Sequence, residues 1–224
     1  MPEFNYQSFE DAPSGEVPVR GYLHVPENSL KDGLVLTHGA GSDCRTALLV
    51  ELAGALCAVG FAVLRCDLPF RQLRPHGPPP RGSAESDQEC LRRAVEVMRR
   101  KVRGRVYLGG HSYGGRQGSM LAATQPGLVD AILLLSYPLH PPKKLTQLRT
   151  THFPAIQAPS LFVHGTRDGF GSVDEMKAAL KLIPARTRLL PVESGGHELM
   201  NARNRSSLPS VVAGAFAVFL KMIE

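Results

Sequence analysis

A serine flanked by glycines is the first candidate for chemistry in this chain. Gly110-His111-Ser112-Tyr113-Gly114 has the pattern G-x-S-x-G, follows the apolar run Val106-Tyr107-Leu108, and precedes a run of mostly small residues suited to a helix, residues 118–123. A sharp turn from a strand into a helix exposes such a serine, and the glycines remove Cβ clashes that would forbid the turn. Ser112 is therefore the candidate nucleophile.

A base and its partner are needed, because a serine hydroxyl is a weak nucleophile until its proton is removed. His197 suits the role of base, and Asp168 suits the role of the carboxylate that fixes the tautomer of the base. Each follows an apolar run, residues 161–163 before Asp168 and residues 188–192 before His197. Both side chains are thus expected where a strand passes into a loop, which is where α/β sheets bind ligands.

Other ionisable residues are weaker candidates for these roles. Asp67 would place the acid after a different strand, and Glu198 is adjacent in sequence to the proposed base, so the spacing favours Asp168. His111 and His164 are expected to support the site by packing or hydrogen bonding, since one base suffices.

An oxyanion hole is the fourth part that such chemistry needs. The segment His38-Gly39-Ala40-Gly41 follows the apolar run at residues 34–36. A glycine-rich loop there could direct the backbone N–H of Ala40 toward the same point as the N–H of Tyr113. We expect these two groups to bind the developing negative charge.

Two proline-rich stretches, residues 68–83 and 137–159, are expected to be irregular loops that overhang the site. Both carry basic residues, and the second has no acidic residue, so a positive potential could attract anionic substrates. Arg71 and His140 are the residues expected to contact the substrate directly. The alternative is that these side chains point into water.

The elements that must position these residues alternate along the chain. Short, continuous apolar runs predict strands buried on both faces, as in a parallel sheet. Segments with apolar residues at three-to-four spacing lie between them and predict helices on both faces of the sheet. The runs are residues 34–36, 61–64, 106–108, 131–135, 160–163 and 188–192. We expect a single α/β domain over residues 1–224, with no large lid domain.

Composition limits the other classes of function. The 43% hydrophobic content suits a globular core, and the basic run between Arg92 and Arg105 is expected to be a solvated helix face because no stacking aromatics accompany it. No zinc spacing or phosphate loop is present, so neither metal nor cofactor is expected. No signal peptide or membrane span is predicted, and four cysteines without a C-x-x-C pair favour the cytoplasm.

Several segments resemble those of a known superfamily. The chain resembles the α/β-hydrolases, among them the small, lidless, dienelactone-hydrolase-like group and its testis-expressed hydrolase-like subfamily. The matching segments are Leu36-Thr37-His38-Gly39-Ala40, Gly109-Gly110-His111-Ser112-Tyr113-Gly114-Gly115-Arg116 and Ser136-Tyr137-Pro138-Leu139-His140-Pro141-Pro142, followed by Leu148-Arg149 and Phe153. The order Ser112, Asp168, His197 is also that of the superfamily.

The resemblance implies the fold and a triad of Ser112, Asp168 and His197, in agreement with the residue spacing. Together they predict a serine hydrolase that cleaves a small-molecule acyl substrate, most simply a carboxylic ester, with thioesters and amides as alternatives. Some relatives resemble subunits of chromatin-modifying complexes, so a non-catalytic interaction module is the second hypothesis. Loss of a triad residue would favour that hypothesis, and all three are present.

Overall fold

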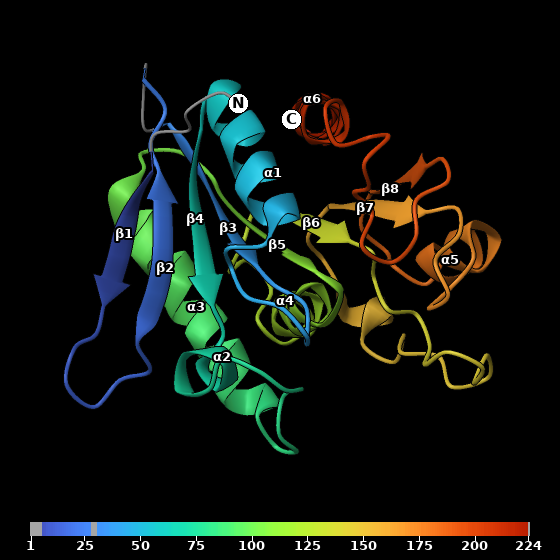
Figure 1. Ribbon diagram of the computed structural model, residues 1–224, viewed down its shortest axis with the longest axis horizontal. Helices are drawn as coiled ribbons and strands as arrows, with labels where there is room; N and C mark the ends of the chain where they lie inside the picture. The colour runs from blue at the N-terminus through green and yellow to red at the C-terminus, as the bar shows by residue number, and fades with distance from the viewer. Residues whose placement is uncertain (1–5, 28–30, 224) are drawn as a thin grey trace.

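The computed structural model of the protein describes residues 6–27 and 31–223 (Figure 1). Eight strands of this described chain form one sheet in the order β1-β2-β4-β3-β5-β6-β7-β8. β1 pairs with β2, and β2 with β4, in antiparallel fashion, and the remaining pairs are parallel. The strands are β1 (Tyr6–Asp11), β2 (Val19–His24), β3 (Asp32–Thr37), β4 (Phe61–Asp67), β5 (Val106–His111), β6 (Ile132–Leu135), β7 (Ser160–Gly165) and β8 (Thr187–Val192).

Helices cover both faces of the sheet, as the sequence predicts. α1 (Ala47–Ala58) and α6 (Leu208–Lys221) share one buried cluster, and α3 (Ala84–Lys101), α4 (Ser112–Thr124) and α5 (Val173–Leu180) share the other. Within β3, Leu34 and Leu36 face the first cluster and Val35 faces the second. Successive side chains of a strand point to opposite faces, so a strand covered on both sides must be apolar throughout.

The six predicted strands are confirmed as β3 to β8, whereas β1 and β2 were not predicted. The side chains of β1 are exposed or half-buried, so this edge strand has no apolar run to reveal it. The stretch at residues 68–83, expected to be irregular, begins with the short helix α2 (Pro69–Leu73), and a 3₁₀ turn, η1 (Phe153–Ala155), lies within the second stretch. Neither stretch forms a separate lid domain.

Acidic partners neutralise much of the basic run on α3. Arg92 forms ion pairs with Glu89 and Glu96 on its own helix, and the buried Arg93 binds Asp11 of β1 at 2.6 Å. These cations therefore stabilise the helix and attach it to the edge of the sheet. That the basic residues of α3 do not bind a nucleic acid stays a prediction.

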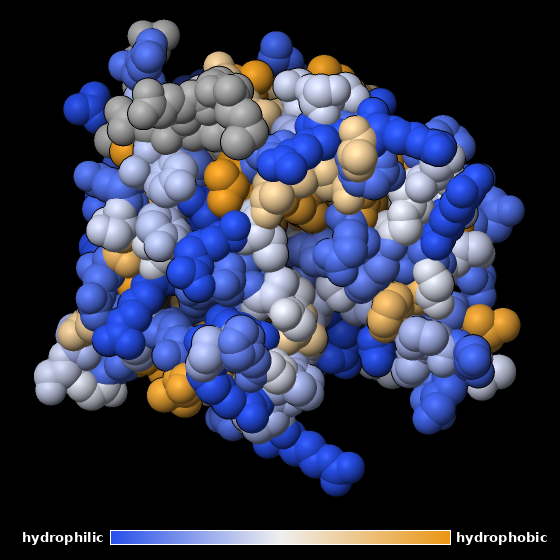
Figure 2. All heavy atoms as spheres, in the orientation of Figure 1, coloured by the Kyte–Doolittle hydropathy of each residue, from blue (hydrophilic) through white to orange (hydrophobic). Residues whose placement is uncertain are grey.

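The outer surface is mixed in character. On the face shown in Figure 2, hydrophobic side chains occur in small groups among polar ones. Among the described residues, no helix is long and apolar enough to cross a membrane. Within the same residues, no group of three or more His, Cys, Asp or Glu side chains is arranged to hold a metal ion.

A buried arginine joins the antiparallel edge to the parallel strands. Arg65 of β4 is fully buried, and its guanidinium lies about 5 Å from the ring centres of Tyr6 and Tyr22. Its Nε donates a hydrogen bond to Nε2 of His24 at 2.8 Å, so that nitrogen must be unprotonated. Burial and the neighbouring Arg65 charge lower the pKa of His24 to about 3.

This contact makes stability depend on pH. The pKa of His24 is lower in the folded state than the usual 6.5, so its contribution is complete above pH 6.5 and is lost as pH falls toward 3. Between pH 6.5 and 5 we expect the His24 contribution to fall by about 2 kcal/mol. In His24→Gln the amide oxygen can still accept a hydrogen bond from Arg65. Urea unfolding of this variant should therefore show a smaller decrease in the free energy of unfolding between pH 7 and pH 5 than wild type shows. Replacing the exposed His76 with Gln is the control; equal losses in wild type and His24→Gln would contradict the assignment.

Candidate active site

The sharp turn between β5 and α4 places Ser112 at the carboxyl edge of the sheet. Its backbone is left-handed, with φ at 49°, a conformation that costs a serine on the order of 1–3 kcal/mol. The glycines beside it have no room for a side chain: a Cβ on Gly110 would lie 2.6 Å from the nitrogen of Gly115, and one on Gly114 would lie 2.4 Å from the carbonyl oxygen of His38. The two glycines of the G-x-S-x-G pattern are thus required because the turn between β5 and α4 leaves no space for a Cβ at either position.

Ser112, His197 and Asp168 are hydrogen-bonded in series. Nε2 of His197 lies 2.7 Å from Oγ of Ser112, and Nδ1 lies 2.9 and 3.0 Å from the two carboxylate oxygens of Asp168. With the Nδ1 proton donated to Asp168, Nε2 is free to accept the proton of the serine hydroxyl. The side chains come from the segments that directly follow β5, β7 and β8, so segments distant in sequence meet at the carboxyl edge of the sheet.

Asp168 is held in its charged form despite complete burial of its side chain. Burial opposes its ionisation, but hydrogen bonds from His197 and from the backbone N–H of Phe170 outweigh this effect and lower the pKa of Asp168. His164, also fully buried, lies 3.9 Å from the carboxylate and donates to the carbonyl oxygen of Gly171 at 2.6 Å. The ionised carboxylate can therefore stabilise a positive charge on His197.

Two contacts orient His197, whose side chain is about one-fifth exposed. The ring of Phe170 stacks on the imidazole with 4.1 Å between ring centres. On the backbone side, Nε2–H of His111 donates to the carbonyl oxygen of His197 at 2.8 Å, which agrees with the supporting role expected from the sequence. The sequence did not point to Phe170. The only feature that could have indicated it is an aromatic residue two positions after Asp168.

The loop after β3 is fixed by a neutral histidine. Nδ1–H of His38 donates to the carbonyl oxygen of Gly39 at 2.8 Å, and Nε2 accepts the backbone N–H of Leu68 at 3.0 Å. Burial is the main reason that the pKa of His38 is lowered, which keeps the ring uncharged. Because C=O and N–H of a trans peptide point in opposite directions, the bond to Gly39 turns the N–H of Ala40 away from His38.

This loop lies directly against the serine turn. A Cβ on Gly39 would be 3.5 Å from Cβ of Ser112, and the N–H of Gly114 donates to the carbonyl oxygen of His38 at 3.1 Å. Within the described chain, the N–H groups of Ala40 and Tyr113 have no hydrogen-bond partner. Two free donors beside the hydroxyl are the groups that the sequence predicts for an oxyanion hole.

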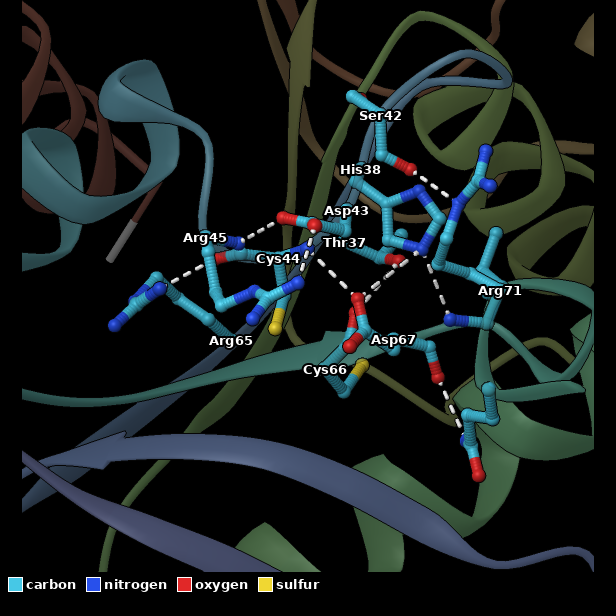
Figure 3. A network of polar contacts seen from close by, with 12 residues as sticks. Thr37, His38, Ser42, Asp43, Cys44, Arg45, Arg65, Cys66, Asp67 and Arg71 are labelled. Atoms are coloured by element: carbon cyan, nitrogen blue, oxygen red, sulfur yellow. Dashed lines mark hydrogen bonds and ion pairs between the residues drawn. The ribbon is translucent and has the colours of Figure 1, made fainter. Parts of the chain in front are cut away.

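The rival carboxylates lie elsewhere. Asp67 accepts the backbone N–H of Cys44 at 2.7 Å and lies 3.6 Å from Nε2 of His38, so it supports the loop after β3 (Figure 3). Glu198 is exposed and follows His197 directly in sequence. Asp168 is the carboxylate that hydrogen-bonds to His197.

The placement of Arg71 does not support direct substrate contact. Its guanidinium is buried and donates to four backbone carbonyl oxygens, among them those of Ser42 at 2.8 Å and Ala40 at 3.0 Å. The ring of His38 lies beside it (Figure 3). Four of its five N–H groups are engaged by the backbone, so Arg71 stabilises the loop after β3.

His140 also lies away from the reacting groups. It is 1% exposed, its Nδ1–H donates to the carbonyl oxygen of Pro141, and Nε2 lies 3.7 Å from Glu175. Its backbone N–H donates to the carbonyl oxygen of Phe170 at 3.0 Å. His140 therefore connects the loop after β6 to the residue that stacks on His197, and it is not placed to touch a substrate.

Comparison with known proteins agrees with the fold. The model of a family described as an alpha/beta hydrolase domain matches residues 31–217. Est1E from Butyrivibrio proteoclasticus is 16% identical, with a TM-score of 0.74 over 96% of this chain and 99% of that one. A dienelactone hydrolase from Anabaena variabilis is 20% identical, with a TM-score of 0.72 over 95% and 97% of the two chains. The Pyrococcus furiosus esterase Pf2001 is 18% identical, with a TM-score of 0.70 over 98% and 93%.

Arg71 provides a test of the loop. Because Arg71→Ala frees the carbonyl oxygens of Ala40 and Ser42, we expect a fall in kcat of roughly 10- to 100-fold that is the same for neutral and carboxylate-bearing esters. Arg71→Lys should restore part of the loss, and Ala at the exposed Arg74 is the matched control. Steady-state kinetics on both esters measures this. A loss confined to the charged ester would instead indicate that Arg71 touches the substrate.

Proposed function

The chain belongs to the alpha/beta hydrolase family, and from this premise we propose that it is a serine hydrolase of small acyl substrates, most simply carboxylic esters. The observation that carries the proposal is the 2.7 Å contact between Oγ of Ser112 and Nε2 of His197, with Asp168 behind the imidazole. The similar structures include proteins described as an esterase and a dienelactone hydrolase, which supports ester chemistry.

The reaction begins with proton transfer. His197 takes the proton of the Ser112 hydroxyl as Oγ attacks the carbonyl carbon, and Asp168 stabilises the imidazolium that forms. The carbonyl oxygen becomes an oxyanion and accepts hydrogen bonds from the N–H groups of Ala40 and Tyr113. Collapse of the tetrahedral intermediate expels the alcohol, which takes its proton from His197 and leaves an acyl group on Ser112.

Water completes the cycle. A water molecule gives a proton to His197 and attacks the acyl-enzyme, and the second tetrahedral intermediate releases the acid and restores the Ser112 hydroxyl. The same parts serve thioesters and amides, which differ in the leaving group that His197 must protonate.

Covalent labelling tests the activation of Ser112. An activated serine oxygen attacks the phosphorus of a fluorophosphonate and expels fluoride, so wild-type protein at pH 7.5 should gain one phosphonyl group and Ser112→Ala should gain none. Intact-mass measurement followed by peptide mapping locates the label. Ala at the exposed Ser86 is the matched control and should label as wild type does. A folded wild-type protein that stays unlabelled would favour the interaction-module hypothesis.

Replacing carboxylates by amides tests the assignment of the acid. Asp168→Asn keeps the volume but favours the wrong imidazole tautomer, so kcat should fall on the order of 10⁴-fold, as in the serine protease case. Asp67→Asn should have a far smaller effect, because Asp67 acts on the loop after β3 and not on His197. Esterase kinetics of the two variants decides between them. If Asp67→Asn is the crippled variant, the acid assignment is wrong.

A further inference from the structure

Arg116 lies one helical turn beyond the nucleophile. It is four residues after Ser112 on α4, so it lies on the same face of the helix and about 6 Å further along the axis. It contributes no ion pair, and its Nε is buried without a hydrogen-bond partner in the described chain. A buried donor without an acceptor costs free energy unless a ligand supplies one.

A second arginine approaches from the loop after β6. The backbone of Arg149 is fixed at both of its polar groups: its N–H donates to the carbonyl oxygen of Leu139 at 2.8 Å, and its carbonyl oxygen accepts from Oη of Tyr137 at 2.6 Å. Its guanidinium makes one long contact, 3.4 Å, to the carbonyl oxygen of Pro138. Most of its donors are therefore unused although the side chain is half-buried.

The surroundings of the two guanidinium groups contain no balancing charge. Oγ of Ser119 donates to the carbonyl oxygen of Arg116 at 2.8 Å and also contacts Nε2 of His152 at 2.8 Å. Burial and the Arg116 charge lower the pKa of His152 to about 4, so this ring is neutral at pH 7. Residues 136–159 contain no Asp or Glu, and no carboxylate of the described chain forms an ion pair with either arginine.

The charge of Arg116 also acts on Arg149. Burial, with the positive charge of Arg116 as the second cause, lowers the pKa of Arg149. The other buried arginines of the described chain have more partners: Arg93 has acidic partners, Arg71 donates to four carbonyl oxygens, and Arg65 donates to His24 and Cys44 and leaves only Nη2 unpartnered. Arg116 and Arg149 combine partial burial, like charge and unpartnered donors, which are Nε on Arg116 and most of the guanidinium on Arg149. An anion bound between the two guanidinium groups would offset the desolvation of the charges, reduce their mutual repulsion and accept hydrogen bonds from the unpartnered donors.

We propose that Arg116 and Arg149 form a subsite for a carboxylate carried by the acyl part of the substrate. The inference rests on the proposed function and deepens it, because it names the class of ester: the half-ester of a dicarboxylic acid. A guanidinium fork matches a carboxylate in a bidentate geometry, and two forks fix its position. The separation of one helical turn from Ser112 suits an acyl chain of several methylene groups.

A matched pair of esters tests this subsite. The mono-4-nitrophenyl ester of adipic acid carries the carboxylate, and 4-nitrophenyl hexanoate is its neutral counterpart. Wild type should favour the adipate ester by about tenfold or more in kcat/KM, and this ratio should fall toward one in Arg116→Gln and Arg149→Gln. Arg149→Lys should keep part of it. Gln at the exposed Lys144 on the same loop is the control and should keep all of it.

Binding to an inactive protein separates this inference from the proposed function. Adipate should bind to Ser112→Ala in isothermal titration, and the additional change Arg149→Gln should weaken binding about tenfold or more, with circular dichroism showing that the fold is kept. If no ester is hydrolysed, the proposed function fails while this titration still decides the subsite. A wild-type ratio of one, or adipate binding unchanged by the arginine variants, overturns it. Binding of inorganic phosphate but not of adipate overturns the assignment to carboxylates.

Discussion

The left-handed backbone at Ser112 is the constraint on which the rest of the site depends. It is tolerated because Gly110 and Gly114 allow the strand, the helix and the loop after β3 to approach within distances that no Cβ would permit. The same close approach brings Ser112 next to Gly39, so the nucleophile and the proposed oxyanion donors are fixed together. The cost of the strained turn is offset by the buried sheet and helices on either side of it.

Around this turn, histidines act mainly as uncharged hydrogen-bonding groups. His38 connects the oxyanion loop to the start of α2, and His111 connects the serine turn to the backbone of His197. Burial lowers the pKa of both, so each can donate with one nitrogen without bringing a charge into the site. Asp168 supplies a buried carboxylate behind His197, and Arg71 directs four of its N–H groups at backbone carbonyl oxygens.

The sequence predicted the parallel strands and the placement of Ser112, Asp168 and His197 at their ends, because strands buried on both faces are visible as apolar runs. It did not predict β1, whose side chains are exposed or half-buried, or β2, in which three buried residues are interrupted by exposed or half-buried ones and form no continuous apolar run. It also assigned Arg71 and His140 to the substrate. Charge alone cannot show that an arginine in a proline-rich segment will be enclosed by carbonyl oxygens, since that depends on how the loop after β3 folds over it.

The central claim is that one hydroxyl and two backbone donors act on the same atom of the substrate. A crystal structure of the protein after reaction with a phosphonate ester tests it most directly, since the tetrahedral phosphorus resembles the intermediate. The account predicts phosphorus bonded to Oγ of Ser112, with the phosphoryl oxygen within about 3 Å of the N–H groups of Ala40 and Tyr113. Phosphorus on another residue, or a phosphoryl oxygen directed away from both N–H groups, would contradict it.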